Sequence, residues 1–212
     1  MQSSTKLKSW SEVMKGIKEY KEGAFFRYIN EEVKTPDLFL QAHPDNMHEK
    51  LKKWSETAKV SDSLYLYGPV GTGKTHGLYA LAKLCRANGL TVKIINLTDT
   101  LEYLKSLFDQ ASYRSEEVFK ELFVKPQILI IDELGAEKTS EWSLSIIYRI
   151  VNKRYELGRY GTYFASNLTP EELGKTYSDR VASRIIGMCR DENEKNKGVI
   201  KLDGVDRRLN KK

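Results

Sequence analysis

The segment GPVGTGKT, at residues 68–75, restricts the fold of this chain more than any other feature. It fits the pattern GxxxxGK followed by Ser or Thr, and it stands between an apolar run at 64–67 and a helical pattern at 75–88. Glycines in such a loop allow backbone torsions that turn successive N–H groups toward phosphate oxygens, and the start of the helix adds partial positive charge. Together the strand, loop and helix predict a nucleotide-binding α/β domain.

Each position of this loop is expected to contribute to a nucleotide site. The Lys74 ammonium has the reach to contact the β- and γ-phosphates, and the Thr75 hydroxyl can ligate Mg²⁺. His76 follows directly. The expected nucleotide-binding residues are Gly68, Pro69, Val70, Gly71, Thr72, Gly73, Lys74, Thr75 and His76. ATP and Mg²⁺ are the cofactors that this set of residues predicts.

From residue 63 onward, strand-like runs alternate with helical patterns. Strands are expected at 64–67, 91–96, 127–132, 162–166 and 198–202. Helices are expected at 75–88, 98–110, 115–124, 140–157 and 178–190. Strands separated by helices of this length indicate βαβ units, and therefore a parallel five-stranded sheet with helices on both faces.

Two acids end the apolar strand ILIID at 128–132. Asp132 is expected beside the phosphate loop, where its carboxylate can hold Mg²⁺, and Glu133 is expected to polarise the attacking water. A pair of adjacent acids favours a hydrolysing ATPase over a kinase or a switch protein. The alternative is that both are solvated acids at the end of a strand.

Two further motifs have both a catalytic and a structural interpretation. Asn167 follows the strand TYFAS and can orient a water together with Glu133, or it can cap the turn before the helix start at 169–172. Arg180 and Arg184 are four residues apart, so they share one helix face. They can reach the γ-phosphate of a neighbouring subunit, or they can form a solvated or Asp179-paired surface.

Composition excludes several classes of protein. The chain has 212 residues, 40% hydrophobic and 30% charged, which suits one well-cored domain with a short appendage. No apolar run approaches the roughly 20 residues that span a bilayer, and no signal peptide is recognisable. Cys85 and Cys189 cannot form a disulfide framework, and the three histidines show no zinc spacing. We therefore expect a reduced, cytoplasmic protein without a membrane partner.

The first 60 residues differ from the rest in their sequence pattern. Apolar residues recur at helical spacing at 10–17 and at 47–54, with irregular stretches around the prolines at 36 and 44. This segment is either a helical appendage packed on the core or a docking element for another protein. We expect a helical partner-docking segment at 1–60, an ATPase core at 61–205 and a basic tail at 206–212.

The phrases GPVGTGKTH, ILIIDELGAE, YFASNLTPEEL and DRVASRIIGMCR, in this order, resemble the DnaC/IstB-like branch of the AAA+ ATPases, which includes helicase loaders and transposition helper ATPases. The likeness extends over residues 60–208. It implies a P-loop NTPase fold of the ASCE/AAA+ type. Two departures from the family pattern are expected, a short N-terminal helical segment and, because about ten residues follow the last expected strand, no C-terminal helical lid. Family loaders often carry a longer N-terminal domain, sometimes with zinc-binding cysteines, and this sequence has no cysteine in its first 60 residues.

The resemblance assigns roles by position. Walker A is matched by Gly68, Gly73, Lys74 and Thr75, Walker B by Asp132 and Glu133, and sensor 1 by Asn167. Arg184 matches the arginine finger, with Arg180 as the fallback. Because such arginines act across subunit boundaries, the resemblance favours the catalytic interpretation of the pair and implies self-association into a ring or spiral with ATP.

The resulting prediction is a Mg²⁺-dependent ATPase that loads a replicative helicase onto single-stranded DNA, in a bacterial cell or a phage-infected host. The alternative is an IstB-like transposition helper that binds duplex DNA and recruits a transposase. A small-molecule kinase fits the phosphate loop but leaves the acid pair and the arginine helix unexplained. The net charge of +6 permits a DNA partner without requiring one. Candidate DNA contacts are Lys105, Arg114, Lys138 and the basic tail, in which Arg207 or Arg208 can also approach the nucleotide.

Overall fold

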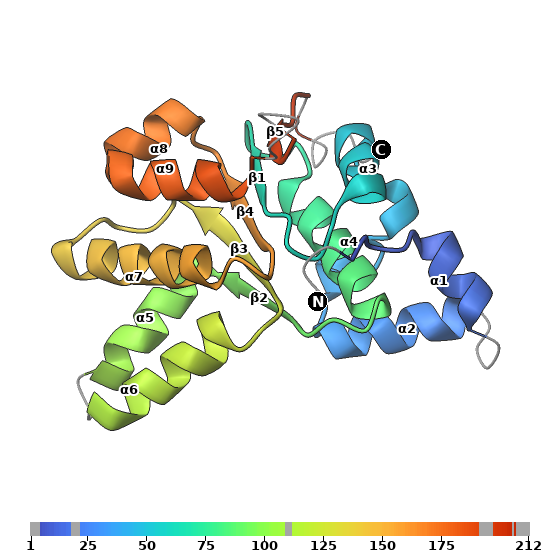
Figure 1. Cartoon of the computed structure of the whole chain (residues 1–212), viewed down its shortest axis with the longest axis horizontal. Coiled ribbons are helices and arrows are strands. Elements are labelled where there is room, and N and C mark those ends of the chain that lie inside the picture. Colours follow the sequence, from blue (N-terminus) through green and yellow to red (C-terminus); the bar gives the residue numbers. More distant parts are fainter. Residues whose placement is uncertain (1–4, 18–21, 109–111, 191–196, 205, 207–212) are drawn as a thin grey trace.

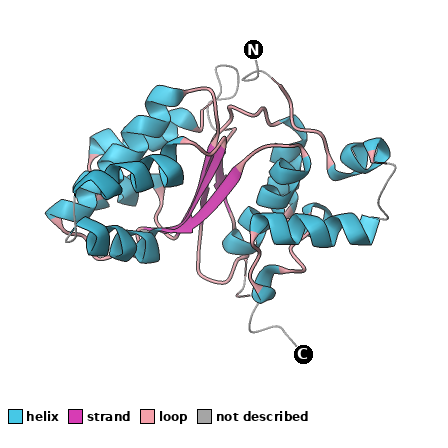
Figure 2. Ribbon diagram, turned by 90° about the horizontal axis from the view of Figure 1, so that it is seen from below, coloured by secondary structure: helices cyan, strands magenta, loops and turns pink. Residues whose placement is uncertain are grey.

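The computed structural model describes residues 5–17, 22–108, 112–190, 197–204 and 206. They form a five-stranded sheet between two layers of helices (Figures 1 and 2). The strands are β1 (Leu64–Tyr67), β2 (Val92–Asn96), β3 (Ile128–Leu134), β4 (Thr162–Ser166) and β5 (Val199–Lys201). All neighbours pair in parallel, in the order β2-β3-β4-β1-β5. The predicted α/β class and all five predicted strands are therefore confirmed, with boundaries that differ by one or two residues.

The strand order determines where the functional segments meet. In a parallel sheet all carboxyl ends lie at one edge, and ligands bind in the crevice outside them. The central strand β4 pairs with β1 on one side, with Ser166 opposite Tyr67, and with β3 on the other side. The phosphate loop after Tyr67, the acids near the end of β3 and the residue after Ser166 consequently lie at the same edge.

Helices cover both faces of the sheet (Figures 1 and 2). One layer contains α1 (Trp10–Gly16), α2 (Glu22–Val33), α3 (Glu49–Thr57) and α4 (Lys74–Ala87). The other contains α5 (Leu97–Phe108), α6 (Ser112–Phe119), α7 (Glu141–Leu157), α8 (Pro170–Thr176) and α9 (Asp179–Met188). Short helical turns lie at Asp37–Phe39 (η1) and Pro44–Asn46 (η2), and a π-helical segment, η3, at Lys120–Val124. None of the described helices is long and apolar enough to cross a membrane.

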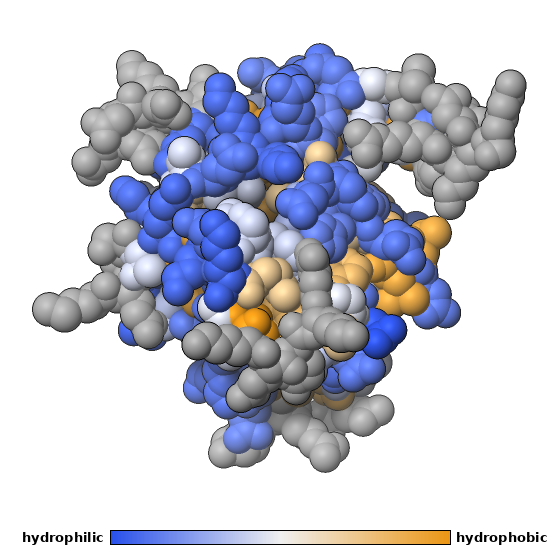
Figure 3. Space-filling view, turned by 90° about the vertical axis from the view of Figure 1, so that its right-hand side faces the viewer, coloured by the Kyte–Doolittle hydropathy of each residue, from blue (hydrophilic) through white to orange (hydrophobic). Residues whose placement is uncertain are grey.

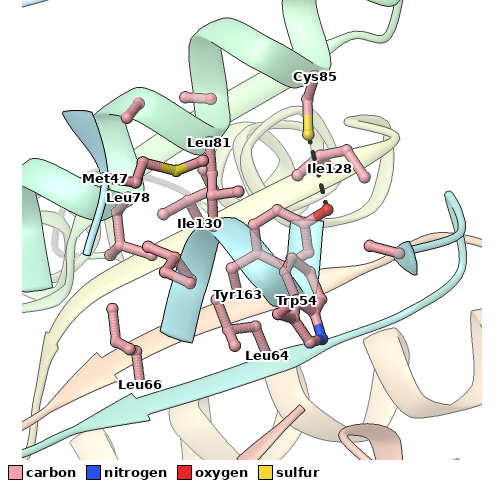
Figure 4. Packing of buried hydrophobic residues seen from close by; sticks show 14 of the residues in the cluster. Met47, Trp54, Leu64, Leu66, Leu78, Leu81, Cys85, Ile128, Ile130 and Tyr163 are labelled. Carbon is pink, nitrogen blue, oxygen red and sulfur yellow. Dashed lines mark hydrogen bonds between the residues drawn. The ribbon is translucent and has the colours of Figure 1, made fainter. Parts of the chain in front are cut away.

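Side-chain alternation along the strands separates two hydrophobic clusters. Leu64 and Leu66 of β1 pack toward α4, whereas Tyr65 packs toward the opposite layer. This period of two is what a sheet covered on both faces requires. Figure 4 shows the α4 side, where Cys85 and Tyr163 approach each other with the Sγ and phenol oxygen 3.6 Å apart. Burial raises the pKa of the Cys85 thiol to about 12, so this thiol is an inert core group.

The N-terminal segment shares the core of the sheet. Met47, Leu51 and Trp54 lie in the same cluster as Leu64 and α4 (Figure 4). Farther out, α1 and α2 form a third cluster that includes Leu84 of α4. The helical spacing found at 10–17 and 47–54 corresponds to α1 and α3, whereas α2 was not predicted. The proposed division of the chain at residue 60 stays a prediction.

A buried arginine connects α7 to the start of two strands. Arg154 is 1% exposed, and its guanidinium donates hydrogen bonds to Thr162 Oγ1 and to the backbone carbonyls of Pro126, Gln127 and Gly161, at 2.7–3.1 Å. Burial lowers the pKa of Arg154 to about 10, so the side chain remains charged at neutral pH. A buried charge is tolerated when its donors are satisfied. This arginine therefore fixes where β3 and β4 begin.

Candidate nucleotide site

A cavity of about 680 Å³ opens at the carboxyl edge of the sheet. Its walls come from the phosphate loop, α4, the ends of β2, β3 and β4, and the turn η1. Of the predicted site residues, the following line it: Val70, Gly71, Gly73, Lys74, Thr75, His76, Asp132, Glu133 and Asn167. The structure therefore brings together the phosphate loop, the acid pair and the polar residue after β4, as the sequence predicts.

The phosphate loop has the torsions that only glycine adopts without strain. Gly68 has φ 144°, and a Cβ there would lie 2.1 Å from the carbonyl oxygen of Leu202. Gly73, at φ 94°, is the N-cap residue directly before α4. Pro69 and Thr72 support the loop instead of lining the cavity, since the buried Thr72 hydroxyl donates to the Pro69 carbonyl at 2.9 Å.

Lys74 and Thr75 form the first turn of α4 and extend from it into the cavity. The Lys74 ammonium donates to the carbonyls of Gly68 and Pro69 at 2.7 and 2.8 Å, so its charge lies inside the curve of the loop. Backbone N–H groups at a helix start and a nearby ammonium are the arrangement that binds phosphate oxygens.

Asp132 and Thr75 meet at the base of the cavity. Asp132 is 8% exposed, and burial raises its pKa, while hydrogen bonds from the Thr75 hydroxyl and from the Glu133 N–H, at 3.0 Å, oppose that rise. A carboxylate next to a hydroxyl supplies the hard oxygen ligands that Mg²⁺ prefers. The residues present therefore fit the divalent cation that accompanies a nucleoside triphosphate.

Glu133 is held in an unusual backbone conformation, with φ 58°. Its exposed carboxylate accepts a hydrogen bond from the Asn96 amide nitrogen at 2.6 Å, and Asn96 ends the neighbouring strand β2. The sequence reasoning missed Asn96. The available signal was a polar amide at the end of an apolar strand, which is the same pattern that identified Asn167.

Asn167 lies on the cavity wall directly after β4. The turn around it is fixed by Ser166, whose hydroxyl donates to the Leu134 carbonyl at 2.6 Å and accepts from the Leu168 N–H at 3.0 Å. Helix α8 is capped by Thr169, whose hydroxyl accepts from the Glu172 N–H. This capping agrees with the helix start expected at 169–172, and the catalytic and structural interpretations of Asn167 both stay predictions.

The arginine pair lies outside this cavity, on α9. The guanidinium carbons of Arg180 and Arg184 each lie 5.3 Å from the centroid of the Tyr148 ring on α7, which places both on one helix face. Arg184 also lies 5.8 Å from Tyr155, and its Nη1 is buried without a hydrogen-bond partner among the described residues. The structure therefore separates the pair from the nucleotide cavity of the same chain.

The candidate DNA-contact residues are dispersed. Lys105 is exposed on α5, and Lys138 is exposed in the loop after β3. Arg114 lies in α6, but its side chain is outside the described part of the chain, as is the tail at 207–212 with Arg207 and Arg208. These residues stay predictions.

Two curated relatives are similar in sequence to about two thirds or more of this chain. DnaI of Bacillus subtilis (strain 168), a replicative helicase loader, is 32% identical over 163 residues, which are 74% of this chain and 51% of DnaI. DnaC of Escherichia coli (strain K12), also a replicative helicase loader, is 30% identical over 141 residues, which are 66% of this chain and 57% of DnaC. The chain thus spans about half the length of the curated relatives it matches.

Solved structures share the fold. The crystal structure of the DnaC helicase loader superposes with a TM-score of 0.64 at 19% identity, over 79% of this chain and 100% of that chain. The replication initiator DnaA bound to AMPPCP and single-stranded DNA superposes with a TM-score of 0.61 at 20% identity, over 78% of this chain and 50% of that chain. These matches show that the chain shares the fold of both proteins.

The sequence profile described as IstB-like ATP binding protein matches residues 43–189, which is well over half of the chain. The match includes the phosphate loop, the acid pair, Asn167 and the arginine helix. It confirms the resemblance inferred from the motifs. The chain belongs to the family of IstB-like ATP-binding proteins.

Proposed function

We propose that this chain is a Mg²⁺-dependent ATPase that loads a replicative helicase onto single-stranded DNA. The observation that carries the ATPase part is the meeting of Lys74, Thr75, Asp132 and Glu133 in one cavity at the carboxyl edge of the sheet. The loader part is supported by 32% identity to a replicative helicase loader over 74% of this chain.

In the proposed hydrolysis of ATP, each residue of the cavity has a separate role. Lys74 offsets the charge of the β- and γ-phosphates, and Thr75 with Asp132 would hold Mg²⁺, which when bound neutralises charge on the phosphate oxygens. Glu133 accepts the proton of the attacking water. The Asn96 amide fixes the Glu133 carboxylate at 2.6 Å, and Asn167, which follows the neighbouring strand β4, orients the water.

The arginine pair completes a neighbour's site instead of its own. Arg180 and Arg184 project from α9 outside the nucleotide cavity, and both are grouped around Tyr148. Guanidinium groups stabilise the charge of the transferring phosphoryl group when a second subunit supplies them. Hydrolysis therefore requires assembly of several copies, consistent with a ring or spiral around DNA.

The N-terminal helices are the proposed surface for the helicase. Figure 3 views the side of the molecule that carries α1, α2 and α3, where mostly hydrophilic residues surround a limited hydrophobic area. Tyr28 of α2 is 41% exposed, so part of its ring is accessible on this surface. Exposed aromatic residues are frequent anchors of protein interfaces.

The partner is tested by capture with the tagged full chain, in separate experiments with a purified hexameric replicative helicase and with an IS21-type transposase. We expect retention of the helicase and not of the transposase. We also expect Tyr28→Ser to weaken retention, whereas Tyr103→Ser, at an exposed tyrosine of α5, leaves it unchanged. Retention of the transposase alone would replace the loader proposal with the transposition-helper alternative.

A further inference from the structure

Helix α4 presents three side chains one turn apart along one face. Thr75, Tyr79 and Lys83 are spaced by four residues, and side chains at this spacing lie above one another on a helix. Thr75 contacts Asp132 inside the nucleotide cavity, and Tyr79 lines the same cavity. Lys83 lies one turn farther along, in the core.

Lys83 is fully buried and is used to bind backbone. Its ammonium donates to the carbonyl oxygens of Phe39, Leu40 and Ala42 at 2.9, 3.2 and 2.7 Å, and it lies 4.9 Å from the centroid of the Phe26 ring of α2. Burial lowers the pKa of Lys83 to about 8, so the ammonium is the main form at neutral pH and the three carbonyls offset its desolvation.

The carbonyls belong to residues 37–42, which we call the strap. The strap joins α2 to the core and includes η1. Within it, the Phe39 ring stacks on the Tyr79 ring with centroids 4.7 Å apart and planes 12° from parallel. Leu38 and Phe39 both line the nucleotide cavity. The contacts of Lys83 and Tyr79 therefore fix a piece of the N-terminal segment as a wall of the site.

The wall formed by the strap is apolar and exposed. Leu38 is 75% exposed and Val70, on the phosphate loop, is 56% exposed, although both line the cavity. Covering large exposed apolar side chains with a flat apolar ligand removes apolar surface from water and therefore favours binding of that ligand. The aromatic base of a nucleoside triphosphate is such a ligand when its phosphates bind to the backbone N–H groups of the phosphate loop.

We propose that Lys83 is a positioning residue that holds the strap against the base of the bound nucleotide, so that base binding and the placement of α1 and α2 stabilise each other. The proposal rests on the nucleotide-binding function proposed above. Residues 34–36 join α2 to the strap. If nucleotide binding stabilises the strap, it also stabilises the position of α2, and a partner that fixes α2 raises the affinity for the nucleotide by the same free energy. Occupancy of the site is thereby communicated to the segment proposed to bind the helicase.

The test compares binding of ATP with binding of inorganic tripolyphosphate, which lacks the base. Leu38→Ala is expected to weaken ATP binding about 10-fold and to leave tripolyphosphate binding unchanged. Leu40→Ala is the matched control, because Leu40 is in the strap and exposed but does not line the cavity. Lys83→Met, which keeps most of the side-chain volume, is expected to show the same selective loss as Leu38→Ala.

A second measurement needs no variant. In the wild-type chain, ATP is expected to slow amide hydrogen exchange at residues 37–42 and in α2, whereas tripolyphosphate does not. Equal protection by both ligands, or Leu38→Ala and a folded Lys83→Met that bind ATP like the wild type, would overturn the proposal. A wild-type chain that binds neither ligand would instead refute the nucleotide-binding function itself.

Discussion

Lys74→Ala is expected to lower the affinity for ATP at least about 100-fold. The ammonium lies inside the phosphate loop, 2.7 Å from the Gly68 carbonyl, at the start of α4. Hydrogen bonds between charged groups contribute about 1.5–3 kcal/mol each, so loss of two to the phosphates amounts to roughly two orders of magnitude in the dissociation constant. Isothermal titration calorimetry with ATP and Mg²⁺ measures this effect directly.

The matched control is Lys93→Ala, which removes an exposed lysine from the edge strand β2. It changes the net charge equally but lies outside the cavity, so ATP affinity is expected to stay at the wild-type value. Circular dichroism of both variants verifies that they are folded. Undiminished ATP binding by Lys74→Ala would show that the loop is not the phosphate site.

The second large effect is expected at α9. Arg184→Ala should bind ATP normally but hydrolyse it at least about 100-fold more slowly, since arginines supplied by a second subunit contribute rate factors of this size or larger. Glu133→Gln should also be inactive, because an amide cannot accept the proton of the water. Mixing the two variants is expected to restore part of the activity, since some interfaces then combine an intact Glu133 with an intact Arg184.

A double variant provides the control for the mixing experiment. Arg184→Ala mixed with a chain carrying both Arg184→Ala and Glu133→Gln contains no intact arginine at position 184, so no activity should return. Steady-state phosphate release, measured on mixtures shown to co-assemble by native mass spectrometry, distinguishes the cases. A co-assembled mixture of the single variants without activity would contradict an arginine acting between subunits.

The sequence predicts those parts of the fold in which a short local pattern is compatible with a single backbone structure. The loop at 68–75 requires glycine torsions and a helix start, and the buried strands show continuous apolar runs, so β1, β3, β4 and α4 were located to within two residues. Because both residues end or follow buried parallel strands, Asp132 and Asn167 were expected in the same cavity. Their chemical roles, like that of Arg184, stay predictions.

Other features depend on tertiary contacts that no local pattern encodes. Helix α2 was missed although Phe25, Ile29 and Val33 recur every four residues, because only the irregular stretches around the prolines at 36 and 44 were noted between the two predicted helical patterns. The hydrophobic periodicity of the sequence does not predict the strap. The strap is held by Lys83, and its three carbonyl partners are more than 40 residues away in the sequence. The local pattern marks Asn96 as a polar residue at a strand end, but its contact with Glu133 follows from the pairing of β2 with β3.

The most direct test of the loader proposal is transfer of a hexameric replicative helicase onto closed circular single-stranded DNA, which offers no end for a ring to thread. The amount of helicase that remains on the circle after gel filtration is measured with and without this chain. We predict transfer that requires both the wild-type chain and ATP and that is lost with Lys74→Ala. Equal amounts of helicase on the circle in the presence and absence of the chain would contradict the proposal.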